Sequence, residues 1–465
     1  MRLSPLLLSV CLLSAASLPA RAGTPVATTA TDAAAALRER ALADDTAWKV
    51  VESLTTEIGP RLAGSEADAR AVAWAQAKFR ELGYDRVWIE PVRFPKWERR
   101  GESAQVLGAH AQPLVVTALG GSPGGTVEAE IVRFDSLEAL QAAPAGSLAG
   151  RIAFVDYRMS RARDGSAYGK GGAIRSRGPS EAIRKGAAGF LMRSAGTSEH
   201  RVANTGITRF DEGLTPVPAA ALSLPDADQL TRLLARGPVR VQLALDCGWD
   251  GEYTSHNVIG EITGREAPQE VVLLGAHLDS WDLGTGAIDD ASGIGITMAA
   301  GRLIGQLPQR PRRTVRVVAF ANEEQGLVGA REYARRHAAD VANHVVAVES
   351  DFGAGRIYGF DTSAGVAHAP ASAIARALAP LGIAPMPGKG GPGPDISPLA
   401  AAGGAWAWLG QDGTHYFDLH HNADDTIDMI DPADLAQNVA AYTVFAWLAA
   451  DASEGFGSAA RAQED

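Results

Sequence analysis

The chain has 465 residues, of which 46% are hydrophobic and 21% are charged, and its formal net charge is −11. This composition is that of a globular protein with ample core, and the length exceeds one ordinary domain, so we expect two domains. An acidic chain without a basic cluster is a poor candidate for binding nucleic acid or an anionic membrane surface. Neither is therefore expected as a partner.

The first 22 residues predict an export signal. Arg2 precedes an apolar run from Leu6 to Leu18, and Ala20-Arg-Ala22 has the small-residue pattern of a cleavage site. The run is too short to span a bilayer. We therefore expect an exported protein, located in the periplasm or outside the cell.

The next part of the chain predicts an arm and the first part of a main domain. Residues 23–43 are rich in Ala and Thr and are expected to form a flexible arm. Residues 44–117 would open the main domain. We expect helices there at 44–57 and 65–82, where Ser65 and Asp68 give an N-cap pattern, and a strand pair at 87–94 that Pro91 interrupts.

Residues 118–248, called the insert below, differ from the residues on either side in their pattern of short strands. This pattern predicts an inserted, mostly-β domain. Short strands are expected at 127–134, 152–157, 189–192, 219–222 and 239–245. Helices are expected at 180–185 and 226–235, and the polar, Gly-rich stretch 161–177 is expected to be an exposed loop. The second part of the main domain would then span 249–452, and 453–465 would be a tail.

From His256 onward, strands alternate with helices. Strands are expected at 257–262, 271–276, 314–321, 344–349, 356–360 and 405–409, and helices at 291–307, 326–337, 369–381 and 432–450. Strands that alternate with helices favour a mostly parallel sheet covered on both faces. The expected fold class is therefore α/β, with a mostly parallel mixed sheet flanked by helices and with the insert as a second domain.

Five candidate metal ligands fall just after predicted strands or in Gly- and Asp-rich loops. They are His277, Asp289, Glu324, Asp351 and His421. Taken singly, each has an ordinary structural explanation, such as a helix cap for Asp289 or a turn for Asp351. Together, two His and three carboxylates at the edge where an open α/β sheet places its ligands match a two-metal site with N and O ligands.

The neighbours of these residues suggest supporting roles. Two cations need a bridging carboxylate, and Asp289 lies in the tightest loop. Asp279 is placed to accept the second ring N–H of His277 and so fix its tautomer. Glu323 is adjacent to the candidate ligand Glu324 and is the candidate general base for a metal-bound water.

Three weaker candidates concern the substrate. Tyr416 could stabilise an oxyanion, although simple packing would explain it as well. Gly390 and Asp395 could belong to a specificity wall, because backbone approaches a substrate closely at glycine. An ordinary surface loop would explain these two equally well.

The candidate residues stand in five motifs. These are Gly275-Ala-His-Leu-Asp-Ser280, Gly286-Ala-Ile-Asp-Asp-Ala-Ser-Gly293, Ala319-Phe-Ala-Asn-Glu-Glu-Gln-Gly326, Glu349-Ser-Asp-Phe-Gly353 and His420-His-Asn-Ala-Asp-Asp-Thr426. With them the chain, from about residue 45 to 450, resembles the co-catalytic zinc metallopeptidases of clan MH. That group holds aminopeptidases and glutamate carboxypeptidases, and the resemblance is strongest to the plasma glutamate carboxypeptidases.

The resemblance implies a ligand set. Asp289 would bridge two zinc ions, with His277 and Asp351 completing one site and Glu324 and His421 the other. The resemblance favours His421 over His420 and Asp351 over Glu349 as metal ligands, because of their places in the motifs. It also implies Glu323 as general base and acid, a cis peptide bond between Asp289 and Asp290, and a protease-associated-like insert.

The implied function is that of a secreted exopeptidase. Such an enzyme, acting as a carboxypeptidase or dipeptidase, hydrolyses terminal bonds of short peptides through a hydroxide held between the zinc ions. An aminopeptidase is the close alternative, because the metal site would be the same. Remote alternatives are a glutaminyl cyclase-like transferase and a non-catalytic receptor-like protein, both of which would lack some of these residues. The resemblance also implies a homodimer.

Overall fold

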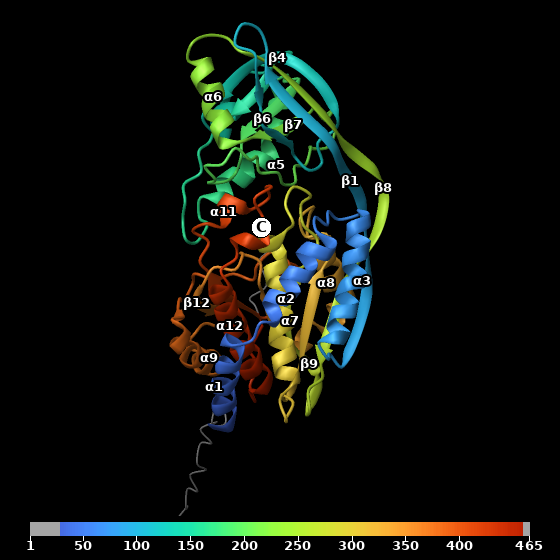
Figure 1. The fold of residues 1–465 in the computed structure, drawn as a ribbon, viewed down its shortest axis with the longest axis vertical. Coiled ribbons are helices and arrows are strands. Elements are labelled where there is room, and N and C mark those ends of the chain that lie inside the picture. The colour runs from blue at the N-terminus through green and yellow to red at the C-terminus, as the bar shows by residue number, and fades with distance from the viewer. Residues whose placement is uncertain (1–27, 459–465) are drawn as a thin grey trace, which may run out of the picture.

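The computed structural model describes residues 28–458, so the predicted export signal at 1–22 lies outside the described residues. The broad lower part of the molecule holds the main domain, and the insert forms the narrower upper part (Figure 1). Two long antiparallel strands, β1 (Arg86–Val106) and β8 (Arg240–Ile262), run along one side from one part to the other. Within residues 28–458 none of the helices combines the length and the hydropathy needed to cross a bilayer.

The main domain is built on a mixed sheet in the order β13-β12-β14-β11-β9-β10-β8. Its strands besides β8 are β9 (Ala267–His277), β10 (Arg313–Phe320), β11 (His344–Glu349), β12 (Ile357–Thr362), β13 (Ala384–Pro385) and β14 (Trp406–Gln411). The central strands β14, β11, β9 and β10 are parallel, whereas β12 runs antiparallel to β14 and β8 runs antiparallel to β10. The expected mostly parallel mixed sheet is confirmed.

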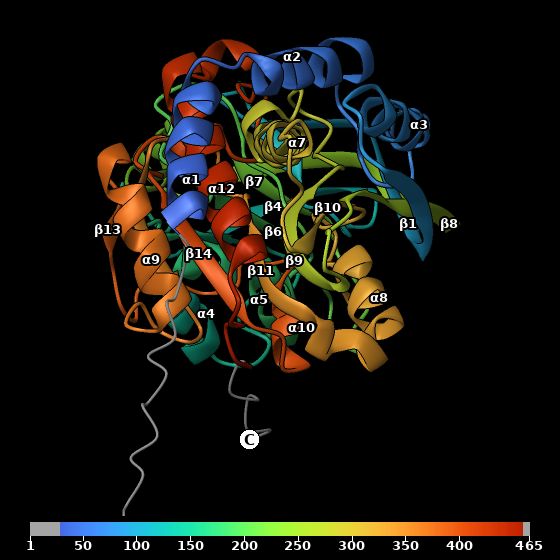
Figure 2. The ribbon, with the colours of Figure 1, turned by 90° about the horizontal axis from the view of Figure 1, so that it is seen from below.

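Helices cover both faces of this sheet (Figure 2). One face carries α1 (Thr28–Leu42), α2 (Thr46–Ser53), α3 (Glu66–Glu81), α7 (Ser292–Gly305), α9 (Ala369–Leu378) and α12 (Pro432–Asp451), and the other carries α8 (Val328–Arg336) and α10 (Ser397–Ala401). Strand β9 is apolar from Val271 to Ala276, because Val272 and Leu274 pack into the first layer while Val271 and Leu273 pack into the second. Short turns of helix lie between these elements, namely η1 (Leu54–Ile58), η2 (Ala287–Ala291), η3 (Ala338–Asn343), η4 (Ala379–Leu381), α11 (Tyr416–Leu419) and η5 (Ile427–Met429).

Both ends of the described chain are more ordered than the composition predicts. The arm expected at 23–43 is helix α1 over Thr28–Leu42, where Ala34, Leu37 and Ala41 are buried against the main core. In the tail expected from 453, Phe456 is fully buried in the same core. These expectations were wrong because small alanine side chains let α1 lie closely against α12, and such packing has no local signal.

The insert holds its own strands and helices. They are β4 (Gly125–Phe134), α4 (Leu137–Ala142), β5 (Ile152–Val155), α5 (Tyr168–Arg184), β6 (Gly189–Arg193), β7 (Ala219–Leu222) and α6 (Leu224–Leu234). The short strands β2 (Gln112–Leu114) and β3 (Val116–Ala118) precede them, and β3 ends at residue 118, where the insert begins. Strands β4 to β7 are parallel and connect to the main sheet through β8. With three helices the insert is α/β rather than mostly β, and its likeness to a protease-associated domain stays a prediction.

Helix α5 occupies most of the stretch 161–177 that was expected to be an exposed loop. Its glycines and Pro179 argue against a helix locally, yet the helix continues through Pro179. A Cβ at Gly178 would lie 2.5 Å from the Phe190 ring, and one at Gly171 would lie 2.9 Å from Ala195. Gly171 and Gly178 therefore let the helix lie close to β6 and to the residues just after it, which only the tertiary structure reveals.

Strand β1 is continuous where an interrupted pair was expected. Pro91 is paired with His256 of β8, within a register that runs unbroken from Arg86 to Pro95. Proline is tolerated on an edge strand because its missing N–H faces away from the partner. Since β8 passes from the insert into the main domain, the domain boundary expected at 248 falls inside one strand.

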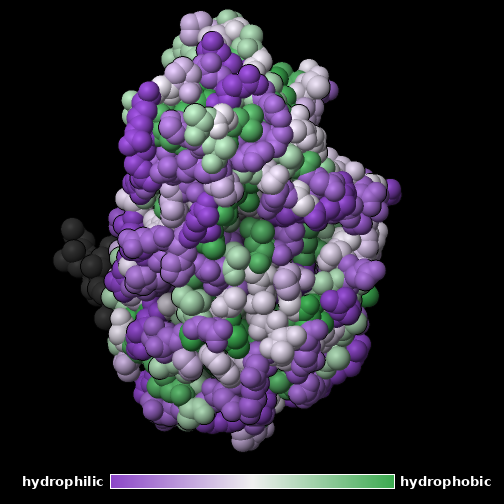
Figure 3. All heavy atoms as spheres, turned by 45° about the horizontal axis from the view of Figure 1, so that its top comes forward, coloured by the Kyte–Doolittle hydropathy of each residue, from purple (hydrophilic) through white to green (hydrophobic). Residues whose placement is uncertain are grey.

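Polar and apolar side chains are interspersed over the face shown in Figure 3. Among the described residues, the large apolar side chains that are exposed are Leu42, Ile89, Trp249 and Met429, which come from different parts of the chain. The surface therefore offers scattered apolar side chains rather than one broad apolar area on this face.

Candidate metal centre

The five predicted ligands meet at one edge of the main sheet. His277 is the last residue of β9, Glu324 follows β10 and Asp351 follows β11. Asp289 lies in η2, just before α7, and His421 follows α11. Because the carboxyl ends of parallel strands lie at the same edge, the local strand pattern brings the first three together.

Asp289 lies between the two histidines. Its Oδ1 is 3.0 Å from Nε2 of His277, which is also 3.4 Å from Oδ1 of Asp351. Its Oδ2 is 3.3 Å from Nε2 of His421, which is also 2.9 Å from Oε2 of Glu324. One carboxylate oxygen thus faces each half of the site, as a bridging ligand requires.

The acidic side chains of the site fit cations. Among residues 28–458, the buried oxygens Asp289 Oδ2, Glu324 Oε1 and Asp351 Oδ1 have no hydrogen-bond partner. A buried carboxylate without a partner costs several kcal/mol, roughly, and a bound cation offsets that cost. Imidazole and carboxylate donors are those that zinc accepts. The residues present therefore fit zinc.

Two further residues lie close enough to compete for a metal. His420 has Nε2 3.6 Å from Asp289 Oδ2, and Asp290 forms a close group with His277 and Asp351. However, both carboxylate oxygens of Asp290 already accept hydrogen bonds, from the main-chain N–H of His277 at 3.1 Å and of Gly293 at 3.0 Å. Asp290 therefore braces the strand end. The peptide bond between Asp289 and Asp290 is cis, as the resemblance implied.

The charges of the site shift its pKa values. Burial would lower the pKa of His277, but the carboxylates of Asp351 and Asp289 raise it well above the ordinary value. Burial, together with the carboxylates of Asp351 and Glu324, raises the pKa of Glu323 well above its ordinary value. Both shifts report a surplus of buried negative charge, which cations would neutralise.

Asp279 acts differently from the prediction. Its main-chain carbonyl, rather than its carboxylate, lies 2.9 Å from Nδ1 of His277, whereas its Oδ1 lies 3.9 Å away. Its carboxylate accepts the main-chain N–H of Glu323 at 3.0 Å and of Glu324 at 3.4 Å. The carboxylate of Asp279 therefore positions the loop that carries Glu323 and Glu324. Its carbonyl orients the His277 ring, because the chain turns directly after His277.

Arg61 was not singled out in the sequence, yet it is fully buried beside the site. Its Nε donates to the carbonyl of Leu278 at 2.5 Å, and its terminal nitrogens donate to the carbonyls of Thr285 at 2.7 Å and Gly286 at 2.9 Å. One guanidinium thus ties the segment after His277 to the loop before Asp289. Main-chain carbonyls carry no residue pattern, so no signal in the sequence could have identified this role.

Asp425 supports the same loop from the other side. Its Oδ1 accepts the main-chain N–H of Ala287 at 2.8 Å and of Ile288 at 2.7 Å. Burial and the nearby Asp289 carboxylate raise the pKa of Asp425 to about 7. The main chain just before Asp289 is therefore held by two side chains, with Arg61 on the carbonyls of Thr285 and Gly286 and Asp425 on the N–H groups of Ala287 and Ile288.

Comparisons with known proteins agree with this geometry. The family model described as peptidase family M28 matches residues 257–446. Human carboxypeptidase Q is 33% identical over 417 residues, which is 89% of this chain and 87% of that protein. The chain belongs to peptidase family M28. Membership of this family makes it a zinc metallopeptidase of the exopeptidase type, as expected.

Solved structures of M28 peptidases share its architecture. A peptidase M28 precursor from Shewanella amazonensis SB2B is 49% identical, with a TM-score of 0.90 over 92% of this chain and 98% of that chain. A zinc aminopeptidase from Bacillus subtilis, 19% identical, has a TM-score of 0.62 over 86% of this chain and 93% of that chain. The second likeness concerns the fold alone.

A cavity of about 530 Å³ adjoins the metal centre of this M28 chain. Its lining is Asp164, Glu349, Asp351, Phe352, Tyr358, Met386, Lys389, Gly391, Pro392, Gly393, Pro394, Ala407, Trp408, Leu409 and Gln411. Residues of the loop 389–394 form one wall of this cavity, in which Gly391 takes part and Gly390 does not, so the role of Gly390 and Asp395 toward substrate stays a prediction. Asp395 is buried behind that wall, and its N–H donates to the Glu349 carboxylate at 3.0 and 2.9 Å.

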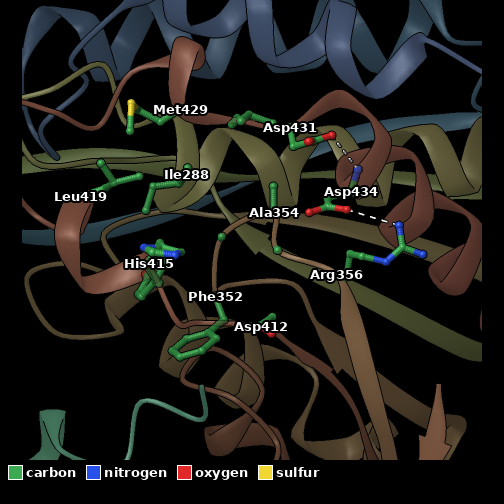
Figure 4. A pocket seen from close by; sticks show the side chains of 14 residues that line it. Ile288, Phe352, Ala354, Arg356, Asp412, His415, Leu419, Met429, Asp431 and Asp434 are labelled. Atoms are coloured by element: carbon green, nitrogen blue, oxygen red, sulfur yellow. Dashed lines mark hydrogen bonds and ion pairs between the residues drawn. The ribbon is translucent and has the colours of Figure 1, made fainter. Parts of the chain in front are cut away.

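Tyr416 lines a second cavity, of about 300 Å³, behind the loop of Asp289. Figure 4 shows Ile288, Leu419 and Met429 on one side of it, and the ion pair between Arg356 and Asp434 on the other. The Tyr416 ring packs 4.7 Å from Phe352 and 5.1 Å from His420, centroid to centroid. These contacts explain Tyr416 by packing, and its role toward substrate stays a prediction.

Replacing Arg61 with Met should loosen the metal loop. The buried carbonyls of Leu278 and Gly286 and the partly buried carbonyl of Thr285 would lose their donor, at about 1–3 kcal/mol for each buried group left unsatisfied. We expect a loss of unfolding free energy on the order of 3 kcal/mol or more in urea titrations, together with lower zinc content. Arg93→Met removes an exposed pairing with Glu252 and should change stability by less than about 0.5 kcal/mol. Equal effects of both changes would contradict the role of Arg61.

Proposed function

We propose that the chain is an exported, dinuclear zinc exopeptidase that hydrolyses terminal bonds of short peptides or dipeptides. The name carboxypeptidase Q, given to its curated relatives, states an exopeptidase activity of this kind. The carrying observation is that the two carboxylate oxygens of Asp289 face two different His-carboxylate pairs. The identity to curated carboxypeptidase Q over most of both chains supports the reaction class. The predicted leader at 1–22 supports export.

Each zinc ion would have two ligands of its own and share Asp289. His277 and Asp351 would hold one ion, and Glu324 and His421 would hold the other. When bound, the ions lower the pKa of water and polarise the peptide carbonyl. The protein's share is to hold these donors in place, which Asp279, Arg61 and Asp425 do through the main chain.

Glu323 is the proposed general base and acid. Its side chain is half-buried, so a substrate can reach it, and its main chain is fixed by the carboxylate of Asp279. Asn322 just before it has φ of 54°, an uncommon conformation for a residue other than glycine that tends to occur at functional sites. Glu323 would take a proton from water and deliver it to the leaving amine.

The cavity beside Asp351 is the proposed site for the terminal residue of the substrate. Tyr358, Met386 and Trp408 give it apolar walls suited to a large apolar side chain. The carboxylates of Glu349 and Asp351 line it too. The Glu349 carboxylate favours a free ammonium group, and so supports the second candidate function, an aminopeptidase or a dipeptidase that requires a free N-terminus; Asp351 is the proposed zinc ligand, and the Lys389 ammonium in the same lining would instead suit a terminal carboxylate.

Glu323→Gln should separate catalysis from metal binding. The amide cannot accept the proton, so kcat should fall by at least roughly 10²-fold while two zinc ions per chain remain. Asp289→Asn should instead lose zinc, because a neutral amide is a poor bridge between two cations. Elemental analysis and hydrolysis of one dipeptide measure both effects.

Glu81→Gln, on the exposed side of α3, is the matched control and should keep both zinc and activity. Normal turnover by Glu323→Gln would remove Glu323 from its role. Full zinc occupancy in Asp289→Asn would disprove the bridge.

Gly391→Leu tests the cavity. Among the described residues, a Cβ at Gly391 would meet nothing within 4 Å, so this wall of the cavity has room for the start of a side chain, and a leucine there is expected to narrow the cavity. We expect kcat/KM to fall at least about 10-fold for peptides with a large apolar terminal residue and much less for those with terminal glycine. Gly101→Leu, at an exposed position that is equally open, is the control. Uniform loss across all peptides would count against this assignment.

Terminal blocking decides the direction of cleavage. One dipeptide is offered free, N-acetylated and C-amidated, with and without chelator. If the Glu349 carboxylate binds the substrate ammonium, acetylation should abolish cleavage. Continued cleavage of the acetylated form, with loss on amidation, would instead establish a carboxypeptidase, and loss with either block a dipeptidase. Cleavage that survives the chelator would contradict a zinc enzyme.

A further inference from the structure

The insert binds the loop that carries the two histidines of the site. The main-chain N–H of Thr205 donates to the carbonyl of His421 at 2.9 Å, and the carbonyl of Thr205 lies 3.2 Å from Nδ1 of the same histidine. Nδ2 of Asn204 donates to the carbonyl of His420 at 2.6 Å. Two adjacent residues of the insert thus hold the main chain of both histidines and one of their rings.

The contact to the ring sets the tautomer of His421. When Nδ1 carries the proton and donates it to Thr205, Nε2 is left with a free lone pair. Nε2 is the atom that lies 2.9 Å from Glu324 and 3.3 Å from Asp289. A metal-binding histidine is oriented in this way by the partner of its other nitrogen.

The contacts to the main chain hold an unfavourable conformation. His421 has φ of 62°, in the left-handed region that residues with a Cβ seldom occupy. Such a conformation is unfavourable and persists where the surroundings hold it. The hydrogen bonds from Asn204 and Thr205 to consecutive carbonyls supply that restraint.

Asn204 and Thr205 are themselves fixed inside the insert. Both are buried, at 2% and 0% exposure. The N–H of Asn204 donates to Oγ of Ser194 at 2.8 Å, and Oγ1 of Thr205 donates to the carbonyl of Ala118 at 2.7 Å. The position of the histidine loop therefore depends on the insert as a folded unit.

We propose that Asn204 and Thr205 are positioning residues that set the zinc affinity of the half-site completed by His421. The inference rests on the proposed function in one respect, namely that His421 is a zinc ligand. It goes beyond that function by making the insert a part of the metal centre. Zinc binding and docking of the insert would then be coupled, so that each strengthens the other.

The test is Asn204→Ala, with zinc affinity measured by competition with a chelator. Residues that orient metal ligands typically contribute about 10–100-fold in affinity, so one of the two zinc ions should bind about 10–100-fold more weakly. Saturating zinc should restore kcat to near the wild-type value, because Asn204 acts through the histidine loop and not on the substrate. A purely structural role would not give this recovery.

The matched control is Thr197→Val. Thr197 also joins the insert to the main domain, but its hydrogen bonds end on the carbonyl of Phe417 and on Oδ1 of Asp418 rather than on the histidines. This variant should keep wild-type zinc affinity. Thermal unfolding in chelator checks that the metal-free proteins are folded, and Asn204→Asp, of similar size but without the amide donor, replaces Asn204→Ala if the latter unfolds.

Each outcome has one meaning. Weaker zinc binding in the Asn204 variant alone supports the proposal. Unchanged affinity in that variant, or an equal loss in Thr197→Val, overturns it, because the loop would then not need the amide or would respond to docking in general. If the wild-type protein itself binds no zinc, the proposed function fails instead, which keeps the two failures apart.

Discussion

The structure depends on the buried negative charge around Asp289. Carboxylates of Asp289, Glu324 and Asp351 lie within a few ångströms of two histidines, with oxygens that have no hydrogen-bond partner among residues 28–458. Buried anions repel one another and lose their hydration, so this arrangement is unfavourable for the protein alone and favourable once cations share it. The neighbouring structure supplies the restraint that keeps these groups together.

That restraint acts through the main chain. Arg61, Asp279 and Asp425 make few contacts with the ligand side chains and instead hold the carbonyls and N–H groups of the loops that carry them. Hydrogen bonds to charged groups are stronger than those between neutral ones, which suits loops that must stay in place against repulsion. The parallel strands bring the loops to one edge, and the charged side chains fix their shape.

The insert extends this principle to the second histidine. Strand β8 makes it continuous with the main sheet, and Asn204 and Thr205 contact the loop of His420 and His421 directly. The two parts of the molecule therefore share both a sheet and a site. The insert is therefore a source of restraint for the loop that carries His420 and His421.

The sequence by itself determined the α/β class, the strands of the main sheet from residue 257 onward except the short β13, and the residues that gather at its edge. It could do so because strand periodicity is local and because parallel strands end at a common edge, so His277, Glu324 and Asp351 were bound to meet. Only the tertiary structure showed that 28–42 and 168–179 are helical: the first stretch is compatible with a helix by its alanines and is fixed by packing on α12, whereas the second is helical despite its glycines because it packs close to β6. The tertiary structure alone revealed the roles of Arg61, Asn204 and Thr205. It also showed that Asp279 contacts the His277 ring through its main-chain carbonyl and not through its carboxylate. These contacts join distant segments through main-chain atoms, which are the same in every residue and therefore leave no pattern in a sequence.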